Sequence, residues 1–215
     1  MRVAVVSAIF GNYDEPVFVE QSVPCDYVMV TDGRGSLHAG WDYQVVDIGG
    51  LDPRLAGKFV KCRPWEYVDA DIHVWMDGSI VPDPGLVEFL VGQLGSGDVG
   101  FFGHYDRSRL TSEAELSARL KKYSGQDVLG QVDSYLDAGH PDGWGLWTAG
   151  VFVWRDGPVV RQLGQMWLDE ICRWTVQDQL SLPVVLRRLN LNPVLLDGCI
   201  SSHRLLRIRA HSDRT

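Results

Sequence analysis

Short runs of apolar residues, rich in β-branched and aromatic side chains, recur along the chain and predict seven β-strands. They occupy residues 3–9, 27–31, 43–48, 72–77, 99–103, 147–154 and 194–197. Between several of these runs, the apolar residues follow helical spacing instead. The pattern therefore predicts strands that alternate with helices.

Three helices are predicted in the middle of the chain. Asp83 as N-cap and Pro84 in the first turn would open a helix that ends near Gly95. Residues 112–123 begin with the spacing of a capping box and continue with apolar residues at helical intervals. Residues 128–139 carry a second short apolar face, so these two segments are expected to form a helical hairpin.

Two further apolar faces, at residues 163–174 and 182–189, predict helices near the C-terminus, with Pro183 either in the first turn of the second or kinking it. Strands alternating with helices indicate an α/β fold with a mostly parallel central sheet flanked by helices. In such folds ligands bind beyond the carboxyl ends of the strands. The sequence shows no repeat, low-complexity tract or linker, and residues 1–215 are expected to form one domain.

Composition and charge exclude several classes of protein. The 215 residues carry a net charge of −8, which argues against nucleic acid as a partner. No apolar run approaches the roughly 18 residues of a membrane span, and the N-terminus lacks a signal-peptide pattern. We therefore expect a cytoplasmic protein without a transmembrane segment. The four cysteines lie far apart and indicate neither a zinc site nor a disulfide framework.

The strongest indication of a functional site is Asp77, which lies at the end of an apolar strand and is followed by Gly78 and Ser79. A carboxylate with a neighbouring hydroxyl suits Mg²⁺ or Mn²⁺, which take oxygen ligands together with substrate phosphates. An Asp-Gly pair after a strand is also common in turns. The C-terminal arginines, among them Arg209 and Arg214, could meet a diphosphate or be solvated.

Four segments occur in a specific order: Ile-Phe-Gly-Asn-Tyr-Asp at 9–14, Pro-Cys-Asp-Tyr-Val at 24–28 running into Thr31 and Asp32, Trp-Met-Asp-Gly-Ser-Ile at 75–80, and Asp-Gln-Leu-Ser-Leu at 178–182. Through these segments the chain resembles the glycosyltransferase-like domain of plant mucilage-related and bacterial proteins, and the resemblance covers almost the whole chain. Residues 103–107 resemble the His-Pro-x-Arg segment of that family, with tyrosine in place of proline.

The resemblance implies a GT-A fold of the nucleotide-diphospho-sugar transferase superfamily, in which an Asp-x-Asp motif holds a metal. Here position 79 is serine, which should weaken metal affinity. The implied metal ligands are Asp77, Ser79 and His203, with His211 as the other late histidine, and the implied cofactor is Mn²⁺ or Mg²⁺.

The resemblance also implies the donor site. Residues 8–13 would form the first strand-to-loop turn around the nucleotide, Asp32 would contact the base or ribose, and Lys58 or Lys61 would approach the phosphates, unless these lysines lie on a solvated helix face. Thr148 and its neighbours would border the sugar. The full donor set is Ala8, Phe10, Gly11, Tyr13, Asp32, Lys58, Lys61, Asp77, Gly78, Ser79, Thr148, Ala149 and Gly150.

Asp178 and Gln179 match an Asp-Gln pair near the sugar C1 in the family, which makes them the implied catalytic residues. As a base, Asp178 would give inversion; as a stabiliser of an oxocarbenium-like state it would give retention. It could instead be a helix N-cap. Trp144, Trp147 and Trp154 could face the sugar or pack in the core.

The expected activity is transfer of a sugar from a nucleotide-diphosphate sugar, with a uridine donor favoured, to a hydroxyl of a carbohydrate, lipid or small molecule. Two alternatives remain open. One is a metal-assisted hydrolase using Asp77, His73 and a late histidine. The other is a catalytically silent module that binds a sugar or nucleotide.

Overall fold

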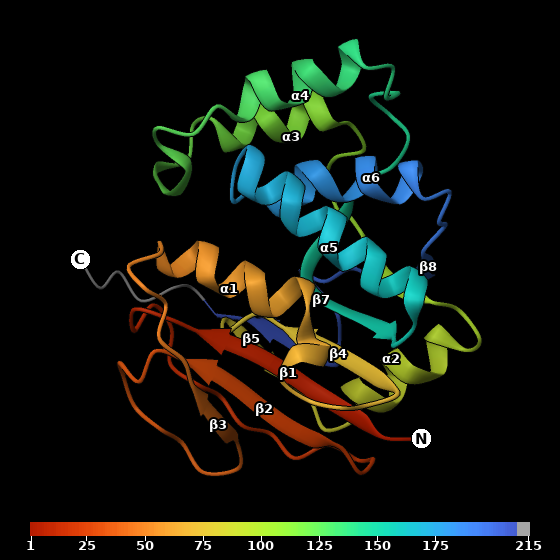
Figure 1. The fold of residues 1–215 in the computed structure, drawn as a ribbon. Helices are drawn as coiled ribbons and strands as arrows, with labels where there is room; N and C mark the ends of the chain where they lie inside the picture. Colours follow the sequence, from red (N-terminus) through yellow and green to blue (C-terminus); the bar gives the residue numbers. More distant parts are fainter. Residues whose placement is uncertain (210–215) are drawn as a thin grey trace.

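The computed structural model describes residues 1–209. Its main feature is a seven-stranded sheet in the order β3-β2-β1-β4-β7-β6-β8, whose strands Figure 1 shows as arrows. β7 runs antiparallel to its neighbours β4 and β6, and the other four strand pairs are parallel. The strands are β1 Val3–Ile9, β2 Asp26–Thr31, β3 Asp42–Val45, β4 Ile72–Met76, β6 Val99–Gly103, β7 Trp147–Arg155 and β8 Val194–Leu196.

These strands confirm all seven predicted positions and the mostly parallel α/β class. β3 ends earlier than predicted, although Val46 still donates its N–H to the Thr31 carbonyl at 2.9 Å. A second, antiparallel sheet of β5 (Ile80–Pro82) and β9 (Leu206–Ile208) was not predicted. Its strands are three residues long, and each forms only because the other, distant in the chain, supplies the hydrogen bonds.

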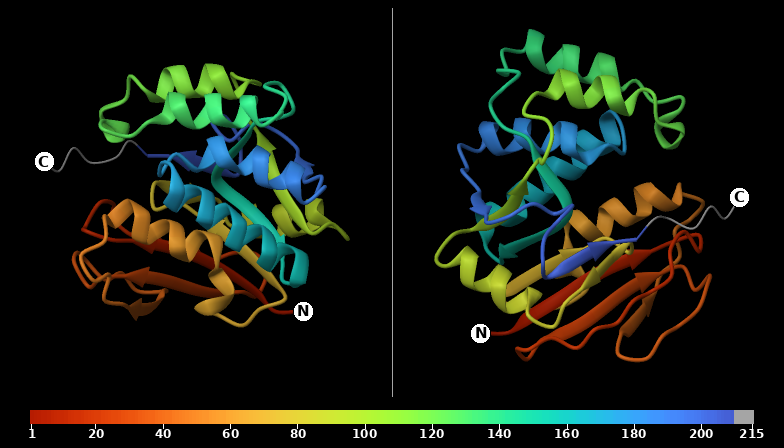
Figure 2. Two further views of the ribbon diagram at one scale, coloured as in Figure 1. Left: turned by 45° about the horizontal axis from the view of Figure 1, so that its top comes forward. Right: turned by 180° about the vertical axis from the view of Figure 1, so that it is seen from behind.

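Helices cover both faces of the main sheet. α1 (Pro53–Cys62), α5 (Pro158–Arg173) and α6 (Asp178–Arg188) share one apolar core with one face of the sheet. α2 (Leu86–Leu94) packs on the opposite face, as the view from behind in Figure 2 shows. α3 (Leu110–Ser117) and α4 (Val128–Asp137) form a third layer outside α6, as Figure 1 shows.

The alternation of side chains along β1 explains the two cores. Ala4 and Val6 point into the core under α1, whereas Val3 and Val5 point toward α2. Because both faces are covered, the strand is apolar except for the buried Ser7, rather than alternating with polar residues. This is why the strands were readable from the sequence.

Several predicted helix boundaries were wrong. α2 begins at Leu86 after Gly85, because the Asp83 carboxylate accepts from the Gly85 N–H at 3.2 Å in a preceding turn; its end at Gly95 is confirmed. α3 begins before the predicted capping box, and its Glu113 lies inside the helix in a buried ion pair with Arg107. The predicted cap residue Ser112 therefore lies inside the helix, and Arg109 occupies the N-cap position.

The remaining helices differ from the predictions in other ways. The helical hairpin of α3 and α4 is confirmed, but Tyr123 belongs to a separate 3₁₀ turn, η2 (Lys121–Tyr123). Pro183 lies in the interior of α6 rather than in its first turn. α1 was not predicted at all, although Asp52 caps it and Pro53 is its first residue.

Candidate active site

The fold brings three predicted segments to one edge of the sheet. β1 and β4 end there, and β7 begins there because it runs in the opposite direction. The N–H of Asp77, just after β4, donates to the Gly150 carbonyl of β7 at 2.8 Å. The edge is therefore the carboxyl end at which ligands bind in parallel α/β folds.

A cavity of about 160 Å³ opens at this edge, between the ends of β1 and β4 and one side of α1. Seven of the predicted donor-site residues line it: Ala8, Phe10, Tyr13, Lys58, Lys61, Asp77 and Gly78. The residues that complete its lining are Ile9, Asp14, Pro53, Arg54, Gly57, Trp75, Lys122, Tyr123 and Val176. Four of the lining side chains are basic and two are acidic, so the wall favours an anionic ligand.

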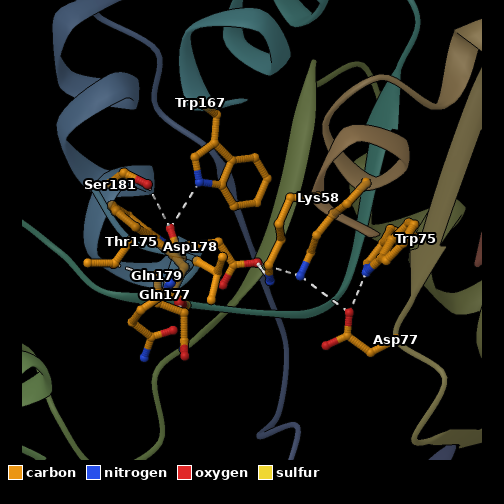
Figure 3. Close-up of polar contacts among 12 residues, drawn as sticks. Lys58, Trp75, Asp77, Trp167, Thr175, Gln177, Asp178, Gln179 and Ser181 are labelled. Atoms are coloured by element: carbon orange, nitrogen blue, oxygen red, sulfur yellow. Dashed lines mark hydrogen bonds and ion pairs between the residues drawn. The ribbon is translucent and has the colours of Figure 1, made fainter. Parts of the chain in front are cut away.

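A buried charge cluster lies at the base of the cavity (Figure 3). Lys58 and Lys61 are three residues apart on α1 and therefore lie on the same side of the helix. Both ammonium groups lie 2.6 Å from Oδ2 of Asp178, and that of Lys61 also lies 3.3 Å from Oδ1 of Asp77. The side chain of Lys61 is 1% exposed and that of Asp178 is 6% exposed. The lysines thus point inward rather than lying on a solvated helix face.

Burial and charge act in opposite directions on Asp178. Burial alone raises the pKa of its carboxyl, but the ammonium groups of Lys58 and Lys61 outweigh burial and hold that pKa well below its usual range. The same attraction raises the pKa of Lys61 despite the burial that lowers it. Asp178 and Lys61 are therefore charged at neutral pH.

Asp178 reaches the lysines because it is the first residue of α6. Gln177 occupies the cap position, so the alternative of Asp178 as an N-cap is wrong. Trp167 Nε1 and Ser181 Oγ donate to the carbonyl of Asp178, at 2.9 and 3.2 Å. These contacts fix the backbone of Asp178 while its carboxylate points toward α1 (Figure 3).

Asp77 is held from two sides. Its Oδ1 accepts from Trp75 Nε1 at 2.7 Å and from Lys61. Its Oδ2 lies 3.5 Å from the point where a Cβ at Gly150 would stand. The side chain is 42% exposed, so this second oxygen is the part of Asp77 that a ligand can reach.

One wall of the cavity comes from a segment that sequence reasoning missed. Tyr123 is buried and donates its hydroxyl proton to Gln177 Oε1 at 2.8 Å. The Gln177 amide nitrogen in turn donates to Glu113 and Ser117, at 2.8 and 2.9 Å. This network connects the 3₁₀ turn that carries Lys122 to the start of α6. Arg54 lies beside this wall, where it donates to the Lys122 carbonyl.

Several predicted donor residues do not line the cavity. The Asp32 carboxylate is buried, accepts from the Gly11 N–H at 3.0 Å and pairs with Arg34 at 3.4 Å, so it holds the loop after β1. Thr148 is buried with its hydroxyl 3.4 Å from the Phe102 carbonyl, and Ala149 lies in the core. Their predicted roles toward a donor remain predictions.

The side chains of the two predicted catalytic residues have different surroundings. Asp178 belongs to the charge cluster, whereas Gln179 donates its side-chain N–H to the Trp147 carbonyl at 3.2 Å. Trp154 is fully buried in the core, which confirms the packing role for that residue. Trp147 lies edge-on to Trp144, with ring centroids 5.6 Å apart.

The predicted metal ligands do not converge around Asp77. Ser79 is buried and does not line the cavity. The His203 ring packs between Phe89 and Phe102 in a separate hollow, and its Nδ1 accepts from the Leu205 N–H at 3.2 Å. Within residues 1–209, no group of three or more His, Cys, Asp or Glu side chains is placed to hold a metal ion. His211 and Arg214 lie outside this range.

The hydrolase alternative receives no support from the site. His73 is at the start of β4, about 13 Å along the strand from Asp77 at roughly 3.3 Å per residue. Its Nε2 lies 3.0 Å from the Val68 carbonyl, and the residue does not line the cavity. Of the C-terminal arginines, Arg209 approaches the site from outside, where it donates to the Gly78 carbonyl at 3.0 Å.

Comparison with known proteins identifies the family of the chain. A family model described as TOD1/MUCI70, glycosyltransferase-like domain, matches residues 44–199, which include the 75–80 and 178–182 segments but not those at 9–14 and 24–28. No curated protein matches the chain. Among the described residues, no helix has the length and apolar character needed to cross a bilayer.

Solved structures match as well. One, titled as the apo structure of the bifunctional glycosyltransferase WbbM, aligns with 14% identity and a TM-score of 0.49, over 91% of this chain and 38% of that one. The chain therefore spans well under half the length of that protein. The family model, in contrast, covers well over half of this chain and supports glycosyl transfer as the general activity. The chain belongs to the TOD1/MUCI70 glycosyltransferase-like domain family.

Proposed function

We propose that this chain transfers a sugar from a nucleotide-diphosphate sugar, with a uridine donor favoured, to a hydroxyl group of a carbohydrate, lipid or small-molecule acceptor. The observation that carries the proposal is the basic cavity at the carboxyl ends of β1 and β4, beside the strand-end Asp77. Phosphates bind where N–H donors and fixed positive charge converge, and here two buried ammonium groups lie at the base of the cavity.

Within this proposal, Asp77 binds the donor through a hydrogen bond. Its Oδ1 is already engaged by Trp75 and Lys61, so Oδ2 is the oxygen that accepts from a hydroxyl of the donor ribose or sugar. Gly150 leaves room beside that oxygen, because a Cβ there would stand 3.5 Å from it. The apolar side chains of Phe10 and Tyr13 line the same cavity and suit the flat face of a nucleobase.

Asp178 is proposed to hold the lysines rather than to remove a proton from the acceptor. A carboxylate whose pKa is held well below its usual range is a weak base at neutral pH. The two ammonium contacts at 2.6 Å would also have to break before it could accept a proton. These features disfavour Asp178 as a general base and favour a role in positioning Lys58 and Lys61.

Nucleotide binding and donor turnover test the proposal. Thermal unfolding is followed with uridine, guanosine, adenosine, cytidine and thymidine diphosphates, and consumption of the corresponding sugar nucleotides is measured by release of the diphosphate. A nucleotide at about 100 times its Kd stabilises the native state by about 2.7 kcal/mol. We expect Asp77→Asn to lose most of this stabilisation.

Asp98→Asn is the matched control, because Asp98 is exposed at the start of β6, at the amino end of that strand. It should leave both binding and turnover unchanged. If no nucleoside diphosphate raises the melting temperature and no sugar nucleotide is consumed, the proposed function is wrong. Binding without turnover on any donor would instead indicate the silent binding module.

A further inference from the structure

A divalent metal ion fits this site poorly. Of the three ligands implied by the sequence, only Asp77 faces the cavity, and its Oδ1 already accepts from Trp75 Nε1 at 2.7 Å and from Lys61 Nζ at 3.3 Å. Ser79 and His203 lie elsewhere. A metal ion in a protein is usually held by one or two carboxylates with hydrogen-bond partners that strengthen them, not by a carboxylate that already neutralises a buried cation.

Lys61 places a fixed positive charge where the metal would be needed. Its side chain is fully enclosed, its ammonium group contacts both Asp77 and Asp178, and it lies 5.5 Å from the centre of the Trp75 ring. An ion bound to Asp77 would stand within a few ångströms of this like charge. In the low-dielectric surroundings of the cluster, this like charge disfavours a cation at Asp77. Lys58 and Lys61 balance Asp77 and Asp178, and the surplus positive charge that attracts a phosphate comes from Arg54 and Lys122.

Lys58 is placed to contact the ligand directly. Within residues 1–209 its ammonium group, which has three N–H donors, pairs with Asp178, and the side chain is 17% exposed on the cavity wall. Arg54 and Lys122 add positive charge at the rim of the same cavity. Asp178 therefore orients Lys58 without using all of its donors.

We propose that this site binds the diphosphate of its donor without a divalent metal, and that the ammonium groups of Lys58 and Lys61 take the place of the ion. The inference rests on the proposed function and departs from the Mn²⁺ or Mg²⁺ expected from the sequence. Charge-assisted hydrogen bonds from lysine neutralise phosphate oxygens as point charges, which requires no coordination geometry.

Asp14 provides the strongest argument for the alternative, in which the site does bind a metal ion. It lines the cavity, and its Oδ2 is 3.1 Å from the point where a Cβ at Gly78 would stand. Asp14 and Asp77 together would give a metal two carboxylates. Direct binding of Mn²⁺ therefore has to be measured alongside nucleotide binding.

The test compares the Kd of the five nucleoside diphosphates and of inorganic pyrophosphate, by calorimetry, in EDTA and in excess Mn²⁺. Mn²⁺ alone is titrated and followed by its electron paramagnetic resonance signal. We expect the Kd of the preferred nucleotide in EDTA to be no higher than in excess Mn²⁺, which itself complexes the free diphosphate, whereas a lost metal contact would raise the Kd in EDTA tenfold for each 1.4 kcal/mol. We also expect no Mn²⁺ binding that Asp77→Asn or Asp14→Asn removes.

Lys58→Gln should raise the Kd in EDTA by about tenfold or more, because one hydrogen bond from a charged donor is lost. Lys58→Arg keeps the charge and should restore part of the affinity. Lys121→Gln is the matched control, since Lys121 is exposed and does not line the cavity. Lys58 is preferred to Lys61 for substitution because Asp178 keeps the buried Lys61 as its partner.

The outcomes separate this inference from the proposed function. Nucleotide binding that needs Mn²⁺, or Mn²⁺ binding lost in Asp77→Asn or Asp14→Asn, overturns metal independence and leaves the transferase proposal standing. An unchanged Kd in Lys58→Gln also overturns the inference. Absence of nucleotide and pyrophosphate binding in both conditions overturns the proposed function and the inference with it.

Discussion

Replacing Asp178 by asparagine removes the negative charge between Lys58 and Lys61 and nearly preserves the shape of the side chain. The Asp178 carboxylate lies 2.6 Å from each ammonium nitrogen. At an effective dielectric constant of about 20, each contact corresponds to a Coulomb energy of about 6 kcal/mol, most of which offsets the cost of burying the charges. Removing one member of a buried ion cluster typically costs about 3–5 kcal/mol.

We expect the lower end of that range for Asp178→Asn, about 3 kcal/mol. Lys58 is 17% exposed and can turn toward water, and Lys61 keeps Asp77 at 3.3 Å. A loss of this size lowers the melting temperature of a chain of this length by about 6–12 °C. Urea unfolding followed by circular dichroism measures the free energy, and a calorimetric scan measures the temperature.

The double variant Lys58→Gln/Asp178→Asn separates the charge cluster from a general packing effect. It removes one of the two uncompensated ammonium groups and should be more stable than Asp178→Asn alone. If Asp178→Asn unfolds within about 1 kcal/mol of the wild type, or the double variant loses the sum of the two single losses, the cluster does not stabilise the fold as described.

The cluster also predicts a dependence on acid. The folded-state pKa of Asp178 is lowered, so its stabilisation is present above the unfolded pKa of about 4 and is lost as the pH falls toward the folded value. Asp178→Asn should lack this component of acid unfolding. Equal slopes of unfolding free energy against pH below about 4 in the two proteins would contradict the assignment.

Three other predictions concern His140 and three helical glycines. Burial and two nearby arginines lower the pKa of His140 to about 4, so the unfolded state binds more protons between about pH 4 and 6.5. Stability should therefore fall by up to about 3 kcal/mol as the pH drops through this range, and His140→Gln should flatten the urea-unfolding profile. Gly164→Ala should cost more than about 3 kcal/mol in urea unfolding, because its Cβ would stand 2.0 Å from the Cys62 carbonyl oxygen; a loss under 1 kcal/mol would contradict that packing. Gly57 and Gly92 lie in helices, and a Cβ added at either would have no atom within 4 Å. Gly57→Ala and Gly92→Ala should therefore each stabilise the native state by about 0.5–1 kcal/mol. Only Gly57 lines the cavity, so only Gly57→Ala should weaken nucleotide binding in calorimetry.

The sequence alone determined the sheet and the position of its main carboxylate. Buried strands of a parallel sheet are apolar on both faces, so runs such as 3–9 and 72–77 stand out without any knowledge of their neighbours. Asp77 was recognisable because a polar residue directly after such a strand lies at the carboxyl edge. Helix ends were less readable, since Asp83 forms a turn instead of a cap and Arg109, not Ser112, is the N-cap of α3.

Only the tertiary structure decided the partners of the charged residues. Lys61 and Asp178 are 117 positions apart in the sequence, and nothing in their local spacing requires the lysine to point inward. The wall formed by Lys122 and Tyr123 likewise depends on a hydrogen bond to Gln177, 54 positions away. Apolar periodicity is a local property of the sequence, whereas the burial of a charge becomes favourable only when the fold supplies its counter-charge. For this reason the sequence located the site, and the fold determined its electrostatics.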